Sequence, residues 1–468
     1  MHSTPQLALV FLCISVLRIR SPCSIVSQAY HFTCLTAGEE YACLALQEKK
    51  SNQNTTIPAL DGVRGIACLS VVEYHVHYLL SYSFHLPVLL GALGTSILMA
   101  GWSGVTLFFV LSGFLLFLPY ARHLIFEQPW PSTRTFYLRR AIRILPGYYF
   151  ALFALIILTH PQYFQWDHLG SLSLFLTFLM DLPSTYQKIN GPFWTLAVEW
   201  QYYMLLPWLA WGFSRFVKRG TSPRRRFWRI VICLAGMMLW GIGTRYVGGY
   251  YTAHPAATFL LPRPLLNAIL LVTYGSSGKY LEDFAIGMLC CTIYTFAHNA
   301  AHDDKTSVYM RRYSSWLWGA GILLLFFMAG WSAYLTQLNF LAPFVGAHSF
   351  LTELGFASGY GLCVTAILFG APGLKLLFTW QPLRWLGTIS YSLYLWHLPI
   401  LLFFKDNVIA LLPFVFLSRY ALYWACVALV IIPCSYLLYR FIERPWMQLA
   451  HTTRSKKRAY SGGGSVPK

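Results

Sequence analysis

Apolar segments of about twenty residues recur along most of this 468-residue chain. A stretch of roughly that length spans the hydrocarbon core of a bilayer as an α-helix, because a helix satisfies its own backbone polar groups where water is absent. We therefore expect an all-α fold, a polytopic transmembrane bundle of about ten helices plus a short re-entrant or interfacial segment. The expected helices lie at 60–80, 98–120, 141–160, 193–213, 227–245, 280–299, 315–335, 349–371, 383–404 and 418–443.

The composition agrees with a membrane protein and argues against other classes. With 57% hydrophobic and 11% charged residues, the chain cannot form a water-soluble globule without large exposed apolar patches. The net charge of +19 would suggest nucleic-acid binding in a soluble protein, but no basic stripe interleaved with aromatic residues is present, so we expect no nucleic acid. The Lys and Arg residues gather in alternate connecting segments, which the positive-inside rule places in the cytoplasm with the N-terminus. These segments are 134–143, 215–229, 305–312, 375–384 and 456–458.

The apolar segment 169–180 does not fit this pattern. It has only about twelve residues, which is short for a membrane crossing and typical of a re-entrant or interfacial piece. A full crossing there would place Arg224, Arg225 and Arg226 outside. The positive-inside rule therefore favours a dip from the outer side, although the sequence leaves a crossing open.

We divide the chain into a flexible N-terminal arm (1–57), a transmembrane domain (58–446) and a polar cytoplasmic tail (447–468). The apolar run 6–17 looks like a signal-peptide core, but no Lys or Arg precedes it and no clear cleavage site follows. An uncleaved arm is the expectation, and cleavage stays open. Most of the cysteines lie in apolar segments and act as small hydrophobic residues, whereas those of the arm can pair only in an oxidising lumen.

Arg64 and His75 are ionisable residues inside the first apolar segment, where such groups are costly enough to suggest a function. Their spacing corresponds to about three helical turns, so both side chains leave one face of a helix, about 16 Å apart along its axis. Asp61 lies one turn before Arg64 and can neutralise it. We expect one continuous cavity open to the cytoplasm, with His75 deeper and able to carry a proton. The alternative is that His75 only packs and hydrogen-bonds between helices.

Further polar residues are candidates for the same cavity. Arg140 and Arg143 are one turn apart and can clamp the phosphates of a donor such as coenzyme A, although topology and lipid headgroups explain them equally well. Glu199 is a carboxylate early in a helix and must meet a base or face water. Three residues share one face of the segment 383–404, where they either link helices or line the cavity: Ser390, Tyr394 and His397.

Other polar and aromatic residues have simpler explanations. Glu73 points away from that face and is expected to pair with His77, one turn on. Glu443 ends the last span and is expected to form a salt bridge with Arg440 or Arg444. Tryptophans are assigned to interfacial belts rather than to a substrate stack. They are Trp102, Trp130, Trp166, Trp316 and Trp331.

Seven short motifs occur in order between residues 60 and 446: LDGVRGIA from residue 60, YH at 74–75, FFVLSGF at 108–114, RAIRILP at 140–146, FWTLAVE at 193–199, ISYSLYLWH at 389–397 and ERP at 443–445. Together they resemble the motif series of the acyltransferase 3 family of integral-membrane acyltransferases. The resemblance implies about ten helices, a cytoplasmic acyl donor that is usually an acyl-CoA, and transfer to a hydroxyl of a sugar, lipid or small molecule. It also implies that Arg64 and His75 form an essential pair and that Arg140 and Arg143 contact the donor.

The chain departs from the family pattern at two positions. Thr195 stands where the family often has Ser, and Trp200 where it often has a second Glu, which leaves the task of Glu199 less defined. No hydrolase-like domain follows the last expected helix, so the chain resembles the stand-alone fungal members, several of which decorate secondary metabolites.

We therefore expect an enzyme, an acyltransferase that transfers groups other than aminoacyl groups, with acyl-CoA as co-substrate, a small-molecule hydroxyl acceptor such as a secondary metabolite, no bound cofactor and no metal. Neutral His75 would take the proton of the acceptor hydroxyl, while Arg64 either stabilises the oxyanion or positions the donor. The expected catalytic residues are His75, Arg64 and Glu199, and the expected substrate-binding residues are Arg140, Arg143, Asp61, Ser390, Tyr394 and His397.

Two other functions remain open at this point. Intramembrane Arg, His and Glu residues also build proton-coupled transporters of small organic substrates, but the sequence shows no inverted repeat with paired broken helices. A non-catalytic acyl or sterol receptor would bind its ligand without turnover. In each case the protein is expected in a membrane as a multi-pass protein, and the sequence does not choose between the plasma membrane and an endomembrane.

Overall fold

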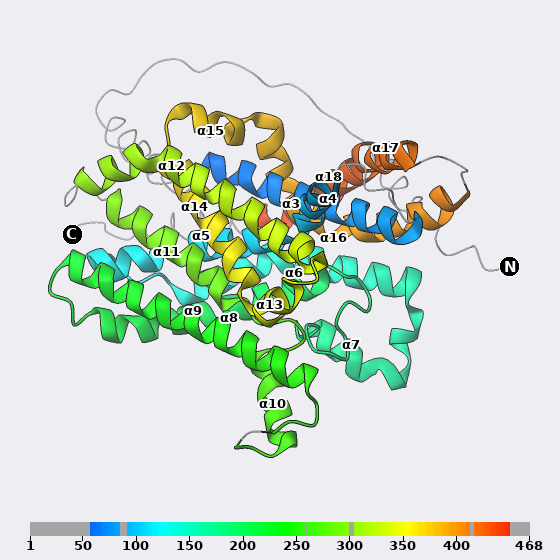
Figure 1. The fold of residues 1–468 in the computed structure, drawn as a ribbon, viewed down its shortest axis with the longest axis horizontal. Helices are drawn as coiled ribbons and strands as arrows, with labels where there is room; N and C mark the ends of the chain where they lie inside the picture. The colour runs from blue at the N-terminus through cyan, green and yellow to red at the C-terminus, as the bar shows by residue number, and fades with distance from the viewer. Residues whose placement is uncertain (1–56, 85–90, 259, 299–303, 412–415, 450–468) are drawn as a thin grey trace, which may run out of the picture.

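The computed structural model describes residues 57–84, 91–258, 260–298, 304–411 and 416–449, and this part of the chain is a bundle of helices without a β-strand (Figure 1). The expectations for the arm, its cysteines and the run 6–17 lie outside the described residues, as does most of the tail. Among the described cysteines all are free thiols and all but Cys233 are buried, which confirms their role as small hydrophobic residues.

A helix occupies each of the expected positions. These helices are α3 (Pro58–Phe84), α5 (Gly104–Phe126), α6 (Thr133–Thr159), α8 (Phe193–Val217), α9 (Pro223–Ala253), α11 (Leu281–Ala297), α12 (Asp304–Ala329), α14 (Thr352–Phe369), α16 (Gln381–Asn407), and α17 (Phe416–Cys426) continued through π-turns and α18 (Ile432–Leu438). Within the described ranges, 7 helical segments are long and apolar enough to cross a membrane. The helices α3, α8 and α11 are not among them, because α11 has only 17 residues and the other two carry polar site residues. Multi-pass insertion is therefore confirmed, but the number of ten crossings is not.

Short helices connect the long ones: α4 (Gly91–Met99), α7 (Leu169–Leu176), α10 (Arg263–Thr273), α13 (Ala342–Ala347) and α15 (Pro372–Thr379). In Figure 1, α10 projects from the bundle and α7 lies at its edge. Helix α7 falls in the segment that the sequence marks as too short to cross. Its 8 residues measure about 12 Å, far less than the hydrocarbon thickness of about 30 Å.

Close backbone contact at glycines fixes the packing of α3 on α16. A Cβ atom at Gly387 of α16 would collide with the carbonyl oxygen of Asp61, and one at Gly65 of α3 with that of Leu383. Small residues at such a contact let two membrane helices approach and gain dispersion energy. The same device joins α5 to α11, where a Cβ atom at Gly287 would collide with the backbone of Val110. The helices α9, α11, α14 and α12 then lie side by side (Figure 1).

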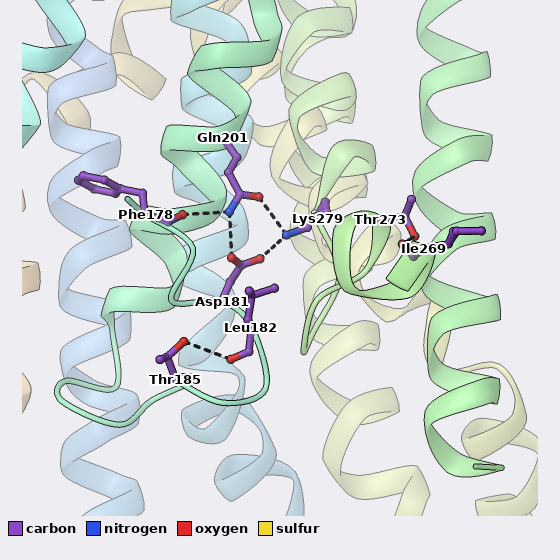
Figure 2. Close-up of polar contacts among 8 residues, drawn as sticks. All are labelled: Phe178, Asp181, Leu182, Thr185, Gln201, Ile269, Thr273 and Lys279. Atoms are coloured by element: carbon purple, nitrogen blue, oxygen red, sulfur yellow. Dashed lines mark hydrogen bonds and ion pairs between the residues drawn. The ribbon is translucent and has the colours of Figure 1, made fainter. Parts of the chain in front are cut away.

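A buried polar network holds the irregular segment that follows α7 (Figure 2). The Lys279 ammonium forms an ion pair with Asp181 and donates a hydrogen bond of 2.9 Å to the side-chain oxygen of Gln201. The Gln201 amide donates to Asp181 Oδ1 at 2.8 Å and to the carbonyl oxygen of Phe178 at 3.1 Å. These bonds fasten residues 178–181 to α8 and to the turn before α11. The carbonyl oxygen of Phe178 in this non-helical segment thereby finds a hydrogen-bond partner within the protein. Irregular backbone inside a membrane needs such partners, because lipid offers none.

Candidate functional site

A first cavity, here called the arginine cavity, is lined by Arg64 of α3, Arg140 and Arg143 of α6, and Glu199 of α8, and it measures ≈ 80 Å³. Ser390 and Tyr394 of α16 complete its wall. Arg139, the neighbour of Arg140, is exposed, because a helix turns about 100° per residue. The fold thus brings Arg64 next to Arg140 and Arg143, which lie far from it in the sequence.

A separate opening lies beside the arginine cavity. It measures ≈ 190 Å³, and Arg64 and Arg143 line it as well, together with Asp61 and Glu443. The Arg64 Nη1 atom lies 3.6 Å from Asp61 Oδ1, which confirms the expected pair one helical turn apart. The Asp61 side chain is 38% exposed, so the pair lies at the edge of the protein interior.

Glu199 belongs to the arginine cavity and not to the surroundings of His75. Its Oε1 atom accepts a hydrogen bond of 2.6 Å from the Ser112 hydroxyl and another from the Tyr203 hydroxyl. The Arg140 guanidinium carbon lies 5.8 Å from the centre of the Tyr203 ring. Glu199 therefore offsets part of the positive charge and orients the ring beneath Arg140, and it meets the sequence requirement that a buried carboxylate find partners.

A second cavity, here called the histidine cavity, contains His75 and measures ≈ 400 Å³. Trp102, Trp194, Tyr280 and Glu353 are among its lining residues. Gln187, Gly191 and Pro192, from the segment that the Lys279 network holds, also form part of its wall.

The bond between His75 and His397 defines the tautomer of both rings. His397 is fully buried, and its Nδ1 atom lies 2.8 Å from the carbonyl oxygen of Tyr394, so this nitrogen donates. The Nε2 atom of a neutral His397 is then an acceptor, and it lies 3.2 Å from His75 Nδ1. His75 Nδ1 also lies 2.9 Å from the carbonyl oxygen of Val71, so it must carry the hydrogen. The remaining nitrogen, His75 Nε2, is left with its lone pair free to accept a proton.

The two cavities are neighbours that share Tyr394 and Val105 in their walls. The sequence predicts one continuous cavity, and the structure instead places Arg64 and His75 in adjacent ones. The physical reason is the Tyr394 side chain, whose hydroxyl lies 2.8 Å from Thr195 Oγ1. Because Thr195 Oγ1 donates to the carbonyl oxygen of Pro192, the Tyr394 hydroxyl is the donor to Thr195. This bond holds the ring across the boundary.

Two predicted pairings are wrong. Glu73 does not pair with His77. Its carboxylate accepts hydrogen bonds from the Tyr420 hydroxyl at 2.7 Å and the Trp424 indole at 3.1 Å, both on α17. The two ring nitrogens of His77 are buried and have no partner among the described residues. A contact between distant helices replaces the local one that sequence spacing suggested.

Glu443 is the second wrong pairing. It is 5% exposed and accepts a hydrogen bond from the Ser392 hydroxyl of α16, whereas Arg440 bonds to Tyr436. The π-turn at Tyr439–Glu443 shifts the helix register and turns this carboxylate inward, toward Arg64 and Arg143. Trp102 also departs from its predicted belt position, because it lines the histidine cavity. By contrast, Trp166 and Trp316 are 88% and 78% exposed, as belt residues are.

Sequence analysis missed several residues of these cavities. Tyr203 lies one turn after Glu199, and that spacing could have revealed it. Glu353 is a carboxylate in an apolar segment, and it could have been found by the reasoning used for Glu199, that such a carboxylate must meet a base or face water. The position of Ser112 depends on packing between α5 and α8, which the sequence does not encode locally.

Comparisons with known proteins agree with the motif series. The chain matches the family described as "Acyltransferase domain", acyltransferase 3, over residues 57–440. It is 24% identical to Peptidoglycan O-acetyltransferase OatA of Listeria monocytogenes, covering 74% of this chain and 49% of that protein. It is 24% identical to Putative peptidoglycan O-acetyltransferase YrhL of Bacillus subtilis, covering 85% of this chain and 56% of that protein. It is 27% identical to Acyltransferase MdmB of Streptomyces mycarofaciens, covering 51% of this chain and 57% of that protein.

The chain thus spans about half the length of the curated relatives it matches. No solved structure matches it. The family match covers more than half of the chain and includes six of the seven motifs, all but ERP at 443–445. This chain therefore belongs to the acyltransferase 3 family of integral, multi-pass membrane proteins.

Proposed function

We propose that this protein is a membrane-embedded O-acyltransferase that moves an acyl group from a cytoplasmic acyl-CoA to a hydroxyl of a small molecule. The observation that carries the proposal is the shared wall of the arginine cavity and the histidine cavity at Tyr394 and Val105. A donor on one side and an acceptor on the other would meet at this wall, next to His75.

The arginine cavity suits the donor. Arginine pairs with phosphate through two parallel hydrogen bonds, and its charge is permanent. The volume of ≈ 80 Å³ admits only the acyl-thioester end of a donor, so the phosphates would lie toward the opening between Arg64 and Arg143. Glu199 then offsets part of the positive charge of the three arginines, and Arg140 stays available to bind the donor.

His75 is the proposed general base. Its Nε2 lone pair takes the proton of the acceptor hydroxyl as the oxygen attacks the thioester carbonyl carbon. The carbon–oxygen bond forms, the carbon–sulfur bond breaks, and the leaving thiolate receives the proton from His75, which yields the ester and free coenzyme A. His397 stabilises the transient imidazolium by accepting from His75 Nδ1.

The Tyr394 ring must turn aside for the two substrates to meet. Its hydroxyl would then leave Thr195 and be free to donate to the carbonyl oxygen on which negative charge develops. The proposal therefore gives Tyr394 two tasks, closing the wall in the absence of substrates and binding the oxyanion in their presence.

The test uses purified full-length protein in nanodiscs, incubated with radiolabelled acetyl-CoA and an extract of small metabolites. The wild type is expected to transfer label to a hydroxyl compound, and His75→Ala to lose activity by roughly 10²- to 10⁴-fold, the usual share of a general base. His77→Leu is the matched control, because His77 lies on the same helix, lacks partners and lines neither cavity. Full activity of a normally folded His75→Ala protein would refute the proposal.

A further inference from the structure

The histidine cavity is larger and more aromatic than a hydroxyl group requires. Its ≈ 400 Å³ is the size of a site for a whole small molecule. Six aromatic side chains line it: Tyr74, Tyr78, Trp102, Trp194, Tyr280 and Tyr394. The faces of such rings carry partial negative charge and attract cations within about 6 Å of the ring centre. The Tyr280 ring already has the Arg245 guanidinium over one face, 4.5 Å from its centre.

Glu353 of α14 is the carboxylate of this cavity. Its side chain is 8% exposed, and its Oε2 atom accepts a hydrogen bond of 2.9 Å from Thr106. No described residue donates to its other oxygen, and no Lys or Arg is among the described residues that line the cavity. One oxygen of a buried carboxylate thus remains for a ligand.

Glu353 has no ion-pair partner of its own among the described residues. Arg245 forms its ion pair with Glu282, at 2.6 Å, and donates to the carbonyl oxygen of Ser277. Asp283 is fully buried, and neither of its carboxylate oxygens has a hydrogen-bond partner in the described part of the chain. Arg245 therefore serves three carboxylates at once. Lys279, three residues before Glu282, is held in an ion pair with Asp181.

We propose that the acceptor carries a cationic ammonium group besides its reacting hydroxyl, and that this group binds between the aromatic rings and Glu353 of the histidine cavity. The ammonium supplies the positive charge that the carboxylates lack, and the faces of the aromatic rings exclude water and attract the cation without a hydrogen bond to it. A quaternary ammonium, such as a trimethylammonium group on a carbon chain, fits best, because it has no N–H group that needs a hydrogen bond. This inference rests on the proposed function, since it names the class of acceptor for the same reaction.

A binding experiment tests the charge directly. Choline has one hydroxyl and a trimethylammonium group, and its uncharged carbon analogue carries a tert-butyl group in that place. Purified full-length protein in a non-ionic maltoside detergent is titrated with each probe by calorimetry. The wild type is expected to bind choline about tenfold or more tightly than the analogue, as desolvated cation–π contacts and a carboxylate imply. Glu353→Gln keeps the side-chain shape and is expected to abolish the preference.

The control is Asp167→Asn, which removes an exposed carboxylate outside the cavity and is expected to keep the preference. Thermal unfolding and binding of coenzyme A report whether Glu353→Gln is folded. Equal binding of the two probes by the wild type, no detectable choline binding, or a preference that survives Glu353→Gln would overturn the inference. Acyl transfer to an uncharged alcohol without choline preference would leave the proposed function standing, whereas choline preference without any acyl transfer would remove that function and leave only a cation-binding site.

Discussion

Arg139, Arg140 and Arg143 form one basic cluster in the sequence, but the helix separates them. Arg140 and Arg143 line the arginine cavity, whereas Arg139 is exposed. The positive-inside rule accounts for positive charge at this end of α6, whichever way the side chains point. Donor binding requires in addition that the charge face the cavity. The three residues therefore distinguish a general electrostatic role from a specific one.

Replacement of either inward arginine should weaken coenzyme A binding. Arg140→Ala and Arg143→Ala each remove a charge-assisted contact of about 1.5–3 kcal/mol, so we expect a dissociation constant roughly 10- to 100-fold higher by calorimetry. Arg139→Ala keeps the same change in net charge and should stay within about twofold of the wild type. If all three variants weaken binding equally, only the overall positive charge matters.

His397 is a positioning residue in the proposed mechanism, because it contacts His75 and lines neither cavity. His397→Leu removes the acceptor for His75 Nδ1, so we expect kcat to fall roughly tenfold to a hundredfold while the KM for the donor stays unchanged. His397→Gln offers an amide oxygen in place of Nε2 and should restore part of kcat. A purely packing role would give the opposite order, with Leu tolerated better than Gln at this buried position.

Sequence periodicity predicted site residues well when they share one helix. Ser390 and Tyr394 do line the arginine cavity, and His397 lies one turn further on, against His75. Periodicity failed where an aromatic ring crosses between helices, as Tyr394 does, or where a π-turn changes the register, as at Glu443. Such features depend on the packing partner, which no local pattern contains.

The positions of the helices along the chain were easier to predict than the helices that each one packs against. Apolar length located each long helix, because the membrane fixes that length, although some ends differ by about eight to eleven residues, as at the starts of α6 and α12. It could not show that α3 packs on α16, which brings His75 to His397. The contact is made by backbone at Gly65 and Gly387, and glycines in an apolar segment do not reveal which helix they will meet.

A methyl group at this contact should therefore damage the site from a distance. Gly387→Ala would place a Cβ atom against the Asp61 backbone, which cannot move aside without shifting α3. We expect a loss of roughly 1–3 kcal/mol, seen as a lower Tm in detergent, and a loss of transfer activity as His75 moves away from His397. Gly236→Ala in α9 has open space around its Cβ position and should leave both measurements unchanged or raise Tm slightly. Equal effects of the two substitutions would contradict the packing argument.

The whole molecule depends on which ends of the helices face the cytoplasm. In the proposed arrangement, the arginine cavity faces the cytoplasm and the histidine cavity lies deeper, so that the donor and the acceptor approach the shared wall from different directions. The orientation follows from alternate basic segments, and that alternation holds only if α7 does not cross. The eight-residue length of α7 supports a dip.

Labelling of single cysteines should show this arrangement directly. In a variant whose 11 native cysteines are replaced by serine, Arg139→Cys, Asp167→Cys and Arg225→Cys each place a thiol at an exposed position. In the proposed arrangement α6 and α8 both cross and α7 does not, so Arg139→Cys and Arg225→Cys should react with a membrane-impermeant maleimide from the cytoplasmic side of sealed vesicles, and Asp167→Cys from the opposite side. Labelling of Asp167→Cys and Arg225→Cys from one common side would mean that α7 crosses or that α8 does not, and the basic segment before α9 would then lie outside, against the proposed orientation of every later helix.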